Sequence, residues 1–247
     1  FNDAIENLVR YETKPLLTRD EFVPGRIIFV NSALAWGGAE RQLVNTAVGL
    51  VGQGTEDITV LCENSAKVPD HDFFLWKLRE SSVTVSELRR HDFERQSKLP
   101  MKELAPLFHK VEGLSLSLKD DIGFLMREFL QRRPEIVHAW QDQTSIKAGI
   151  AAALVGVPKI VLSTRNLAAH RFTYHLPYMR WGYRAISRWK NVVLLNNSRA
   201  GAADYAAWLD IPVERFRVLA NGFAPGDFVS WDDGAIQDFR QRLGLPD

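Results

Sequence analysis

Short apolar runs alternate with longer stretches of helical periodicity along most of the chain. Runs rich in β-branched residues predict strands, and strands that are apolar on both sides are typical of a parallel sheet covered on both faces. The predicted strands are residues 26–30, 57–61, 83–88, 135–139, 159–163, 191–195 and 216–220. Because helical patterns separate these runs, they indicate βαβ units.

Helical periodicity fills the intervals between the predicted strands. Three stretches, 63–76, 89–110 and 221–234, lack regular patterning. The pattern predicts an α/β fold, a doubly wound, mainly parallel Rossmann-like sheet with helices on both faces, and such folds bind ligands at the carboxyl ends of their strands. The helices are expected to begin near Gly38, Leu114, Gln143, Leu176 and Ser198, the last of these as an N-cap.

Composition is that of an ordinary globular protein, with 46% hydrophobic and 25% charged residues among 247. A formal net charge of +1 gives no whole-molecule field for nucleic acid. Cys62 is the single cysteine, which excludes a disulfide framework and a cysteine-based metal site and favours a reduced, cytoplasmic setting. The first residue is not Met and the last residues follow a helix-like segment, so both ends are expected to be cut.

Two glycines, Gly37 and Gly38, follow the first predicted strand where the chain turns into a helix. The first N–H groups of a helix lack intrahelical partners and attract anions, and a bare backbone lets a phosphate approach closely. A tight turn with no ligand explains the glycines equally well. The glycine fingerprint of dinucleotide-binding proteins and the Gly-Lys-Ser/Thr ending of a P-loop are both absent, which disfavours a dehydrogenase and a P-loop enzyme.

Three stretches resemble glycosyltransferase family 4, which comprises retaining enzymes of the two-domain GT-B fold. GGAERQLVNTAVGL is similar to the family's opening, and PEIVHAWQDQTSIKAGIAAALVGVPKIVLSTRN to its middle strand, helix and strand. NNSRAGAADYAAWLDIPVERFRVLANGF resembles its closing strand, helix and hinge. The resemblance covers roughly 26–223 and implies a Rossmann-like N-terminal, acceptor-side domain at 1–222. Residues 223–247 would then be a hinge and the start of a C-terminal donor-binding domain, which carries the family's paired glutamates.

The resemblance implies transfer of a sugar, with retention, from a nucleotide-sugar donor to a glycan or lipid-linked acceptor in cell-surface polysaccharide or glycolipid synthesis. Gly37 and Gly38 would contact the donor diphosphate. No cofactor besides the donor, no metal and no nucleic acid are expected. The setting would be the cytoplasm or the inner face of the membrane, and residues 1–247 alone would be inactive.

The middle stretch departs from the family pattern at one position. Members often carry a second histidine two residues after the first, whereas this chain has His138 and then Trp140. The catalytic role implied for that position falls on Trp140, which can stack on a sugar but cannot exchange a proton. His138 is also a candidate catalytic residue, and the alternative is a strand histidine whose ring is satisfied by its neighbours. Gln141, Asp142 and Gln143 follow, and they offer hydrogen bonds to acceptor hydroxyls or, alternatively, cap a helix.

Residues 165–190 hold six basic residues and no acid. Arg180, Arg184 and Arg188 recur every fourth residue along a predicted helix, where like charges destabilise one another. An anionic partner is therefore expected, either an acceptor phosphate, an anionic membrane or acidic residues of the second domain. A solvated basic face is the plain alternative.

Arg165 and Asn166 follow a predicted strand directly, at the edge of the expected cleft. A planar guanidinium suits the phosphate or carboxylate of an acceptor. Two hypotheses remain, a sugar transferase and a non-catalytic α/β domain that binds a glycan or a head group. A second α/β half with paired glutamates would favour transfer.

Overall fold

The computed structural model describes residues 15–63, 70–88, 116–223 and 231–246. Seven strands form one sheet in the order β3-β2-β1-β4-β5-β6-β7, and every neighbouring pair is parallel. The predicted fold class is confirmed, and each predicted strand overlaps an observed one. The strands are β1 (Val23–Asn31), β2 (Ile58–Cys62), β3 (Thr84–Glu87), β4 (Pro134–Trp140), β5 (Lys159–Thr164), β6 (Val192–Asn196) and β7 (Phe216–Val218).

The five helices with a predicted start begin within two residues of it, whereas the sequence predicts no helix at 75–80, where the structure has one. Ser198 is the N-cap of its helix, since its side chain accepts a hydrogen bond from the backbone N–H of Gly201. The stretch 89–110 lies outside the described residues, as do 64–69 and 224–230. The α-helices are α2 (Gly38–Gly52), α3 (Leu75–Glu80), α5 (Leu116–Arg132), α6 (Asp142–Val155), α7 (Tyr178–Ile186), α8 (Arg199–Leu209) and α9 (Asp233–Arg242), and the 3-10 turns are η1 (Arg19–Glu21), η4 (Ala169–Arg171) and η5 (Val213–Arg215).

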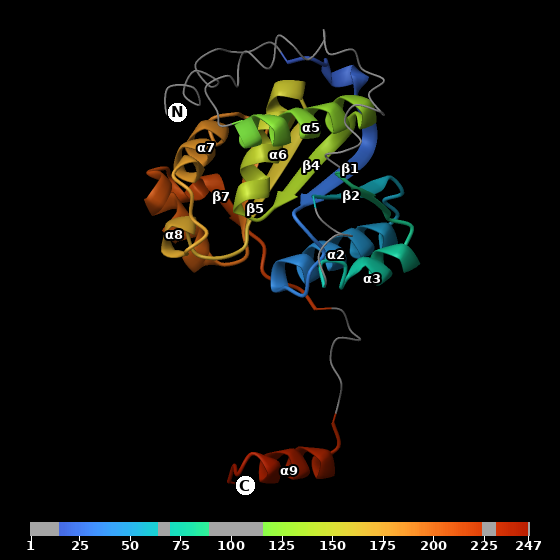
Figure 1. The fold of residues 1–247 in the computed structure, drawn as a ribbon, viewed down its shortest axis with the longest axis vertical. Coiled ribbons are helices and arrows are strands. Elements are labelled where there is room, and N and C mark those ends of the chain that lie inside the picture. Colours follow the sequence, from blue (N-terminus) through green and yellow to red (C-terminus); the bar gives the residue numbers. More distant parts are fainter. Residues whose placement is uncertain (1–14, 64–69, 89–115, 224–230, 247) are drawn as a thin grey trace.

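The strand order reverses between β1 and β4, and this reversal decides which helices cover which face. Right-handed crossovers place α2 and α3 on one face and α5 to α8 on the other (Figure 1). Alternate residues of β1 serve the two cores: Ile28 and Val30 pack with α5 to α8, whereas Ile27 and Phe29 pack with α2 and α3. The loops after β1 and β4 diverge at the reversal, where doubly wound folds open a ligand crevice.

Helix α6 is buried on nearly all sides, and close contact with α7 fixes it beside the crevice. A Cβ on Gly182 of α7 would lie 2.7 Å from Ile146 of α6. One on Gly149 of α6 would lie 3.2 Å from both Ile186 and Leu162. The two glycines therefore let the helices approach closely, which fixes the position of the first turn of α6.

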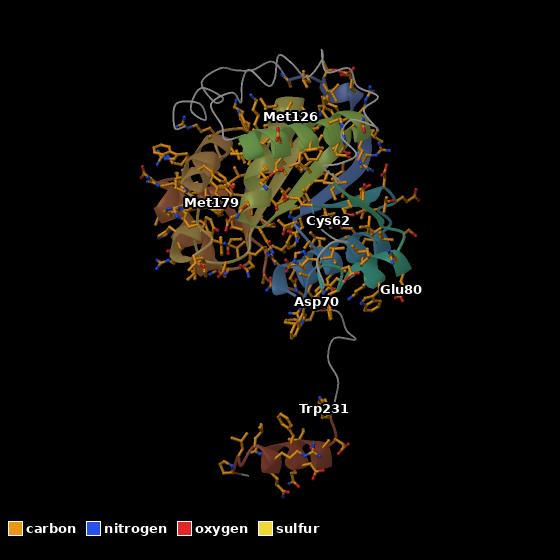
Figure 2. All side chains as sticks on the ribbon, viewed as in Figure 1. Cys62, Asp70, Glu80, Met126, Met179 and Trp231 are labelled. Atoms are coloured by element: carbon orange, nitrogen blue, oxygen red, sulfur yellow. The ribbon has the colours of Figure 1, made fainter. Side chains whose placement is uncertain are left out.

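Side chains away from the crevice carry less functional information. Cys62 is buried at the end of β2 (Figure 2), and burial raises the pKa of its thiol to about 12, so the thiol stays protonated at neutral pH. Helix α9 has no buried residue. None of the helices in the described ranges is both long and apolar enough to cross a bilayer.

Candidate functional site

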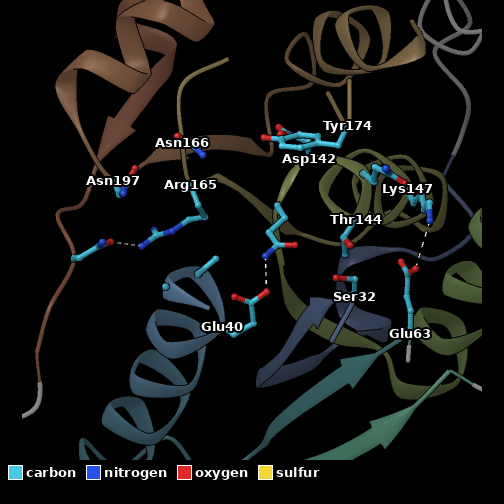
Figure 3. Close-up of a pocket in the computed structure, with 15 residues that line it drawn as sticks. Ser32, Glu40, Glu63, Asp142, Thr144, Lys147, Arg165, Asn166, Tyr174 and Asn197 are labelled. Atoms are coloured by element: carbon cyan, nitrogen blue, oxygen red, sulfur yellow. Dashed lines mark hydrogen bonds and ion pairs between the residues drawn. The ribbon is translucent and has the colours of Figure 1, made fainter. Parts of the chain in front are cut away.

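A cavity of about 620 Å³ opens at the carboxyl end of the sheet, between the starts of α2 and α6 (Figure 3). It lies at the reversal of strand order, at the carboxyl ends of the strands, and the sequence predicts a ligand at the carboxyl ends. Six of the predicted candidates line it: Gly38, Gln141, Asp142, Gln143, Arg165 and Asn166. The complete lining is Ser32, Gly38, Ala39, Glu40, Glu63, Gln141, Asp142, Gln143, Thr144, Lys147, Arg165, Asn166, Tyr174, Asn197 and Asn221.

The two glycines before α2 occupy different environments. Gly37 is the N-cap in an extended conformation, and a Cβ there would lie 2.1 Å from Glu40 Oε2. Gly38 is the first helical residue and lines the cavity, and a Cβ there would meet no atom within 4 Å. Only Gly38 therefore leaves the helix start bare toward the cavity, whereas the bare Gly37 accommodates the side chain of Glu40.

Glu40 is a site residue that the sequence reasoning missed. It is 7% exposed, and its Oε1 accepts a hydrogen bond from Gln141 Nε2 at 2.6 Å (Figure 3). A carboxylate in the first turn of a helix is stabilised by the helix dipole, so Glu40 partly neutralises the positive N-terminal end of α2. An acidic residue three positions after a glycine N-cap was the available signal.

Gln141 joins β4 to α6 in a strained conformation, with φ 65° and ψ 163°. Residues other than glycine seldom adopt this region, and the cost is of order 1–3 kcal/mol. Backbone bonds on both sides hold the residue: its N–H donates to Ser163 O at 3.0 Å and its C=O accepts from Ser145 N at 2.8 Å. Gln141 is the N-cap of α6, but its side chain makes no capping hydrogen bond. Its side-chain amide donates to Glu40 instead.

Asp142, the first residue of α6, is buried and held by tyrosine hydroxyls. Its Oδ1 accepts hydrogen bonds from Tyr183 Oη at 2.9 Å and Tyr205 Oη at 2.5 Å. Burial raises the pKa of the Asp142 carboxyl, although hydrogen bonds from Tyr205, Tyr183 and Tyr174 act in the opposite direction. These tyrosines come from α7, α8 and the loop before α7, so Asp142 ties three segments to the cavity wall.

Lys147 supplies a buried positive charge from α6. Its Nζ lies 2.8 Å from Asp121 Oδ2 and 3.4 Å from Glu63 Oε2. Burial opposes the charge, yet Glu63 and Asp121 together raise the pKa of Lys147, so the ammonium is kept. Sequence reasoning missed this cluster because its members come from α5, α6 and the residue that follows β2. In the ranges that the structure describes, no three or more His, Cys, Asp or Glu side chains gather to hold a metal ion.

Arg165 forms the wall between this cavity and a second one. Its Nη2 donates to Asn221 Oδ1, and its Cζ lies 4.5 Å from the centroid of the Trp140 ring, a cation–π contact. Burial lowers the pKa of Arg165 to about 10, which leaves the guanidinium charged at neutral pH. Asn166 is exposed, and its Oδ1 accepts from the N–H of Leu167.

His138 and Trp140 do not line the first cavity. They line a second cavity of about 450 Å³ beside α2, into which Arg165 also projects. His138 Nε2 lies 2.7 Å from Ser163 Oγ, and the ring packs 5.2 Å from Phe29 and 4.9 Å from Trp140. Burial, and then the charge of Arg165, lower the pKa of His138 to about 3, so the ring is neutral at neutral pH.

The pKa of His138 predicts acid sensitivity of the fold. An unfolded histidine binds a proton below its ordinary pKa of 6.5, whereas folded His138 does so only near 3. The unfolded state therefore gains protons first, and stability falls as pH drops through this window, by at most about 1.4 kcal/mol per pH unit. Lowering the pH from 7.5 to 5.0 should reduce the free energy of unfolding of the wild type more steeply than that of His138→Gln. Urea unfolding at each pH measures both. Parallel pH profiles would contradict the prediction.

The basic row of α7 faces the end of α8. Arg180 Nε donates to Trp208 O at 2.7 Å, and Arg184 Nη1 donates to Leu209 O at 2.8 Å. These carbonyls belong to the last turn of α8, where the helix dipole favours cations. Arg188 lies beyond the end of α7 and is exposed. Arg184 Nη1 also lies 3.3 Å from Asp210 Oδ2, so two of the three arginines have partners within the chain. A membrane or interdomain role for the row stays a prediction.

These contacts predict unequal effects along the row. The double change Arg180→Gln and Arg184→Gln removes two bonds to carbonyls of α8 and the exposed ion pair of Arg184 with Asp210, so it should lower the free energy of unfolding by about 1–2 kcal/mol. Arg188→Gln should change it by less than about 0.5 kcal/mol. Urea unfolding measures both. Equal effects of the double and the control variant would mean that the bonds to α8 contribute no stability.

Comparisons with known proteins agree with the fold. No protein-family model matches the chain. The chain is 26% identical over 215 residues to the Vi polysaccharide biosynthesis protein VipC/TviE of Salmonella typhi, over 81% of this chain and 37% of that protein. Anabaena Alr3699/HepE, solved with UDP and glucose, matches with TM-score 0.58 and 18% identity over 89% of this chain and 50% of that one.

A glycosyltransferase from Rickettsia africae matches with TM-score 0.55 and 15% identity, over 90% of this chain and 50% of that chain. The chain therefore spans about half the length of these solved structures and less of the curated relative. At these identities the structural likeness establishes the fold, a Rossmann-like α/β domain of the kind found in GT-B glycosyltransferases.

Proposed function

We propose that the chain is the acceptor-side part of a retaining glycosyltransferase of GT-B type, similar to family 4. It would transfer a sugar from a nucleotide-sugar donor to a glycan or lipid-linked acceptor in cell-surface polysaccharide or glycolipid synthesis. The observation that carries the proposal is the polar cavity at the reversal of strand order, with bare Gly38 at its helix start. The Vi polysaccharide relative and the HepE complex with UDP and glucose support it.

Charges in the cavity favour a division between phosphate and sugar. The free N–H groups at the start of α2 and the charged Arg165 suit a diphosphate. The Glu40 carboxylate would repel a phosphate, but it is bonded to Gln141. We infer that sugar hydroxyls bind the pair Glu40–Gln141, with the carboxylate accepting hydrogen bonds and the amide donating them. The diphosphate would lie against Gly38 rather than Gly37.

Neither aromatic residue at the end of β4 suits proton transfer at neutral pH. His138 is neutral and bonded to Ser163, and Trp140 is 2% exposed beneath Arg165. We infer that catalysis rests on positioning of the substrates and on stabilisation of an oxocarbenium-like centre and a departing phosphate. Backbone N–H groups and Arg165 would supply the positive potential, and further donor contacts would come from a second domain beyond the hinge at 223–247.

The test uses protein expressed from its complete reading frame. It is incubated with a panel of nucleotide sugars and with glycan and lipid-linked acceptors, product mass is measured, and the anomeric configuration of the new linkage is read from the proton NMR spectrum of the product. An acceptor gaining one sugar with retained anomeric configuration supports the proposal, and residues 1–247 alone should give no product. Acceptor binding without any product across the panel would favour the non-catalytic binding domain, and robust transfer by residues 1–247 alone would overturn the two-domain arrangement.

A further inference from the structure

The second cavity, of about 450 Å³, lies between α2, the end of β4 and the segment after β7. Besides Gln42 and His138, whose side chains are paired with Gly222 and Ser163, four side chains in its wall carry N–H donors: Asn45 of α2, Lys77 of α3, Trp140 and Arg165. Three of them have a donor without an acceptor. Trp140 Nε1, Arg165 Nε and Asn45 Nδ2 are each buried and lack a hydrogen-bond partner.

Such a concentration of unpaired donors is unusual, because buried polar groups nearly always find partners. Trp140 is the clearest case, since only 2% of the residue is exposed and an indole N–H can only donate. The orientation of Asn45 is fixed by its neighbour: Lys77 Nζ donates to Asn45 Oδ1 at 2.9 Å, which leaves Nδ2 as the unpaired atom. Each unsatisfied donor carries a desolvation penalty, which an acceptor in the cavity would remove.

The charges of this cavity point in the same direction. Lys77 and Arg165 are both cationic, and within the described part of the chain neither forms an ion pair with a carboxylate. No Asp or Glu is among the residues that line this cavity, whereas Glu40, Glu63 and Asp142 line the first. The two cavities thus share Arg165 but differ in character, the first mixed in charge and the second rich in donors and positive.

We propose that the second cavity is a subsite for an oxyanion, the carboxylate or the phosphate group of a sugar-bearing ligand. Lys77 and Arg165 neutralise its charge, and the N–H groups of Asn45 and Trp140 donate hydrogen bonds to its oxygens. Charge-assisted bonds of this kind are about twice as strong as neutral ones. The assignment to a sugar rests on the proposed function, whereas the oxyanion requirement rests on the donors alone.

The test is an NMR titration of the complete chain labelled with 15N-tryptophan, in which Trp140→Phe identifies the indole signal of Trp140. Glucuronate, glucose 1-phosphate and glucose are the three probes. We expect at least one anionic probe to shift the Trp140 signal saturably, and we expect glucose to bind with at least tenfold lower affinity. Lys77→Gln should lower the affinity for the anion about tenfold. Arg79→Gln, on the same helix but outside both cavities, should leave the affinity unchanged.

Each outcome has a definite reading. A response to glucuronate alone identifies a carboxylate ligand, and a response to glucose 1-phosphate alone identifies a phosphate. Equal responses to glucose and to the anions, no response to any probe, or an unaltered affinity in Lys77→Gln would overturn the subsite. Because binding is measured without turnover, absence of sugar transfer together with selective anion binding would count against the transferase proposal only.

Discussion

Gly38→Val is expected to lower kcat/KM for sugar transfer about a hundredfold while changing the free energy of unfolding by less than about 1 kcal/mol. A Cβ at Gly38 meets no protein atom within 4 Å, so valine fits the fold. Its methyl groups would instead enter the cavity and keep a phosphate from the N–H groups at the start of α2. Steady-state kinetics of the full-length protein and urea unfolding measure the two effects.

Gly52→Val is the matched control for this substitution. Gly52 ends the same helix, a Cβ there also meets no atom within 4 Å, and the residue lines neither cavity. The control should therefore match the change in stability and leave the kinetics unaltered. If Gly38→Val destabilises the protein but transfers sugar at the normal rate per folded molecule, the glycine serves the turn and no ligand reaches it.

Much of the fold follows from local sequence. Continuous apolar runs such as 192–195 are long enough to be strands and too short to be helices. Ser198 is a typical N-cap residue and predicts the start of the helix that follows. Handedness then fixes the faces on which the helices lie. Helix α3 was harder to predict because its six residues span less than two turns, and periodicity needs more length to be distinguished from chance.

The candidate site was predictable only where a local signal exists. Gln141 and Arg165 directly follow strands, Gly38 begins the helix after the first strand, and parallel strands bring their carboxyl ends together. The sequence could not separate Gly37 from Gly38, since the difference depends on the direction of the Glu40 side chain. Lys147 was missed because its partners are distant in sequence, Glu63 by 84 residues, and no single-sequence pattern reports such a pairing.

The arginine row illustrates how tertiary structure changes an electrostatic argument. Repulsion between like charges at i and i+4 correctly implies that something offsets it. The expected partners were an acceptor phosphate, an anionic membrane or acidic residues of the second domain. Instead, Arg180 and Arg184 donate to main-chain carbonyls at the end of α8, and Arg184 also pairs with the carboxylate of Asp210 just after that helix. Carbonyl groups have no sequence signature, because every residue carries one. Only the packing of α7 on α8 reveals them as the acceptors.

Asp142→Ala is expected to lower the free energy of unfolding by about 2–4 kcal/mol. Tyr183 and Tyr205 are fully buried, and both hydroxyls donate to Asp142 Oδ1. Without that oxygen two buried donors lose their acceptor, at about 1–3 kcal/mol each. Burial raises the pKa of Asp142, which means that the buried charge itself costs stability, and its removal offsets part of the loss. Urea unfolding at pH 7 measures the net effect.

Asp142→Asn separates the hydrogen bonds from the charge. An amide oxygen can still accept from the two tyrosines, so the loss should be no more than about 1 kcal/mol. Tyr183→Phe combined with Tyr205→Phe in the Asp142→Ala background should recover part of the stability, because the unsatisfied hydroxyls are then gone. If Ala and Asn at this position destabilise equally, the tyrosine bonds do not hold α6 to α7 and α8, and the first turn of α6 owes its place beside the cavity to the packing at Gly149 and Gly182 alone.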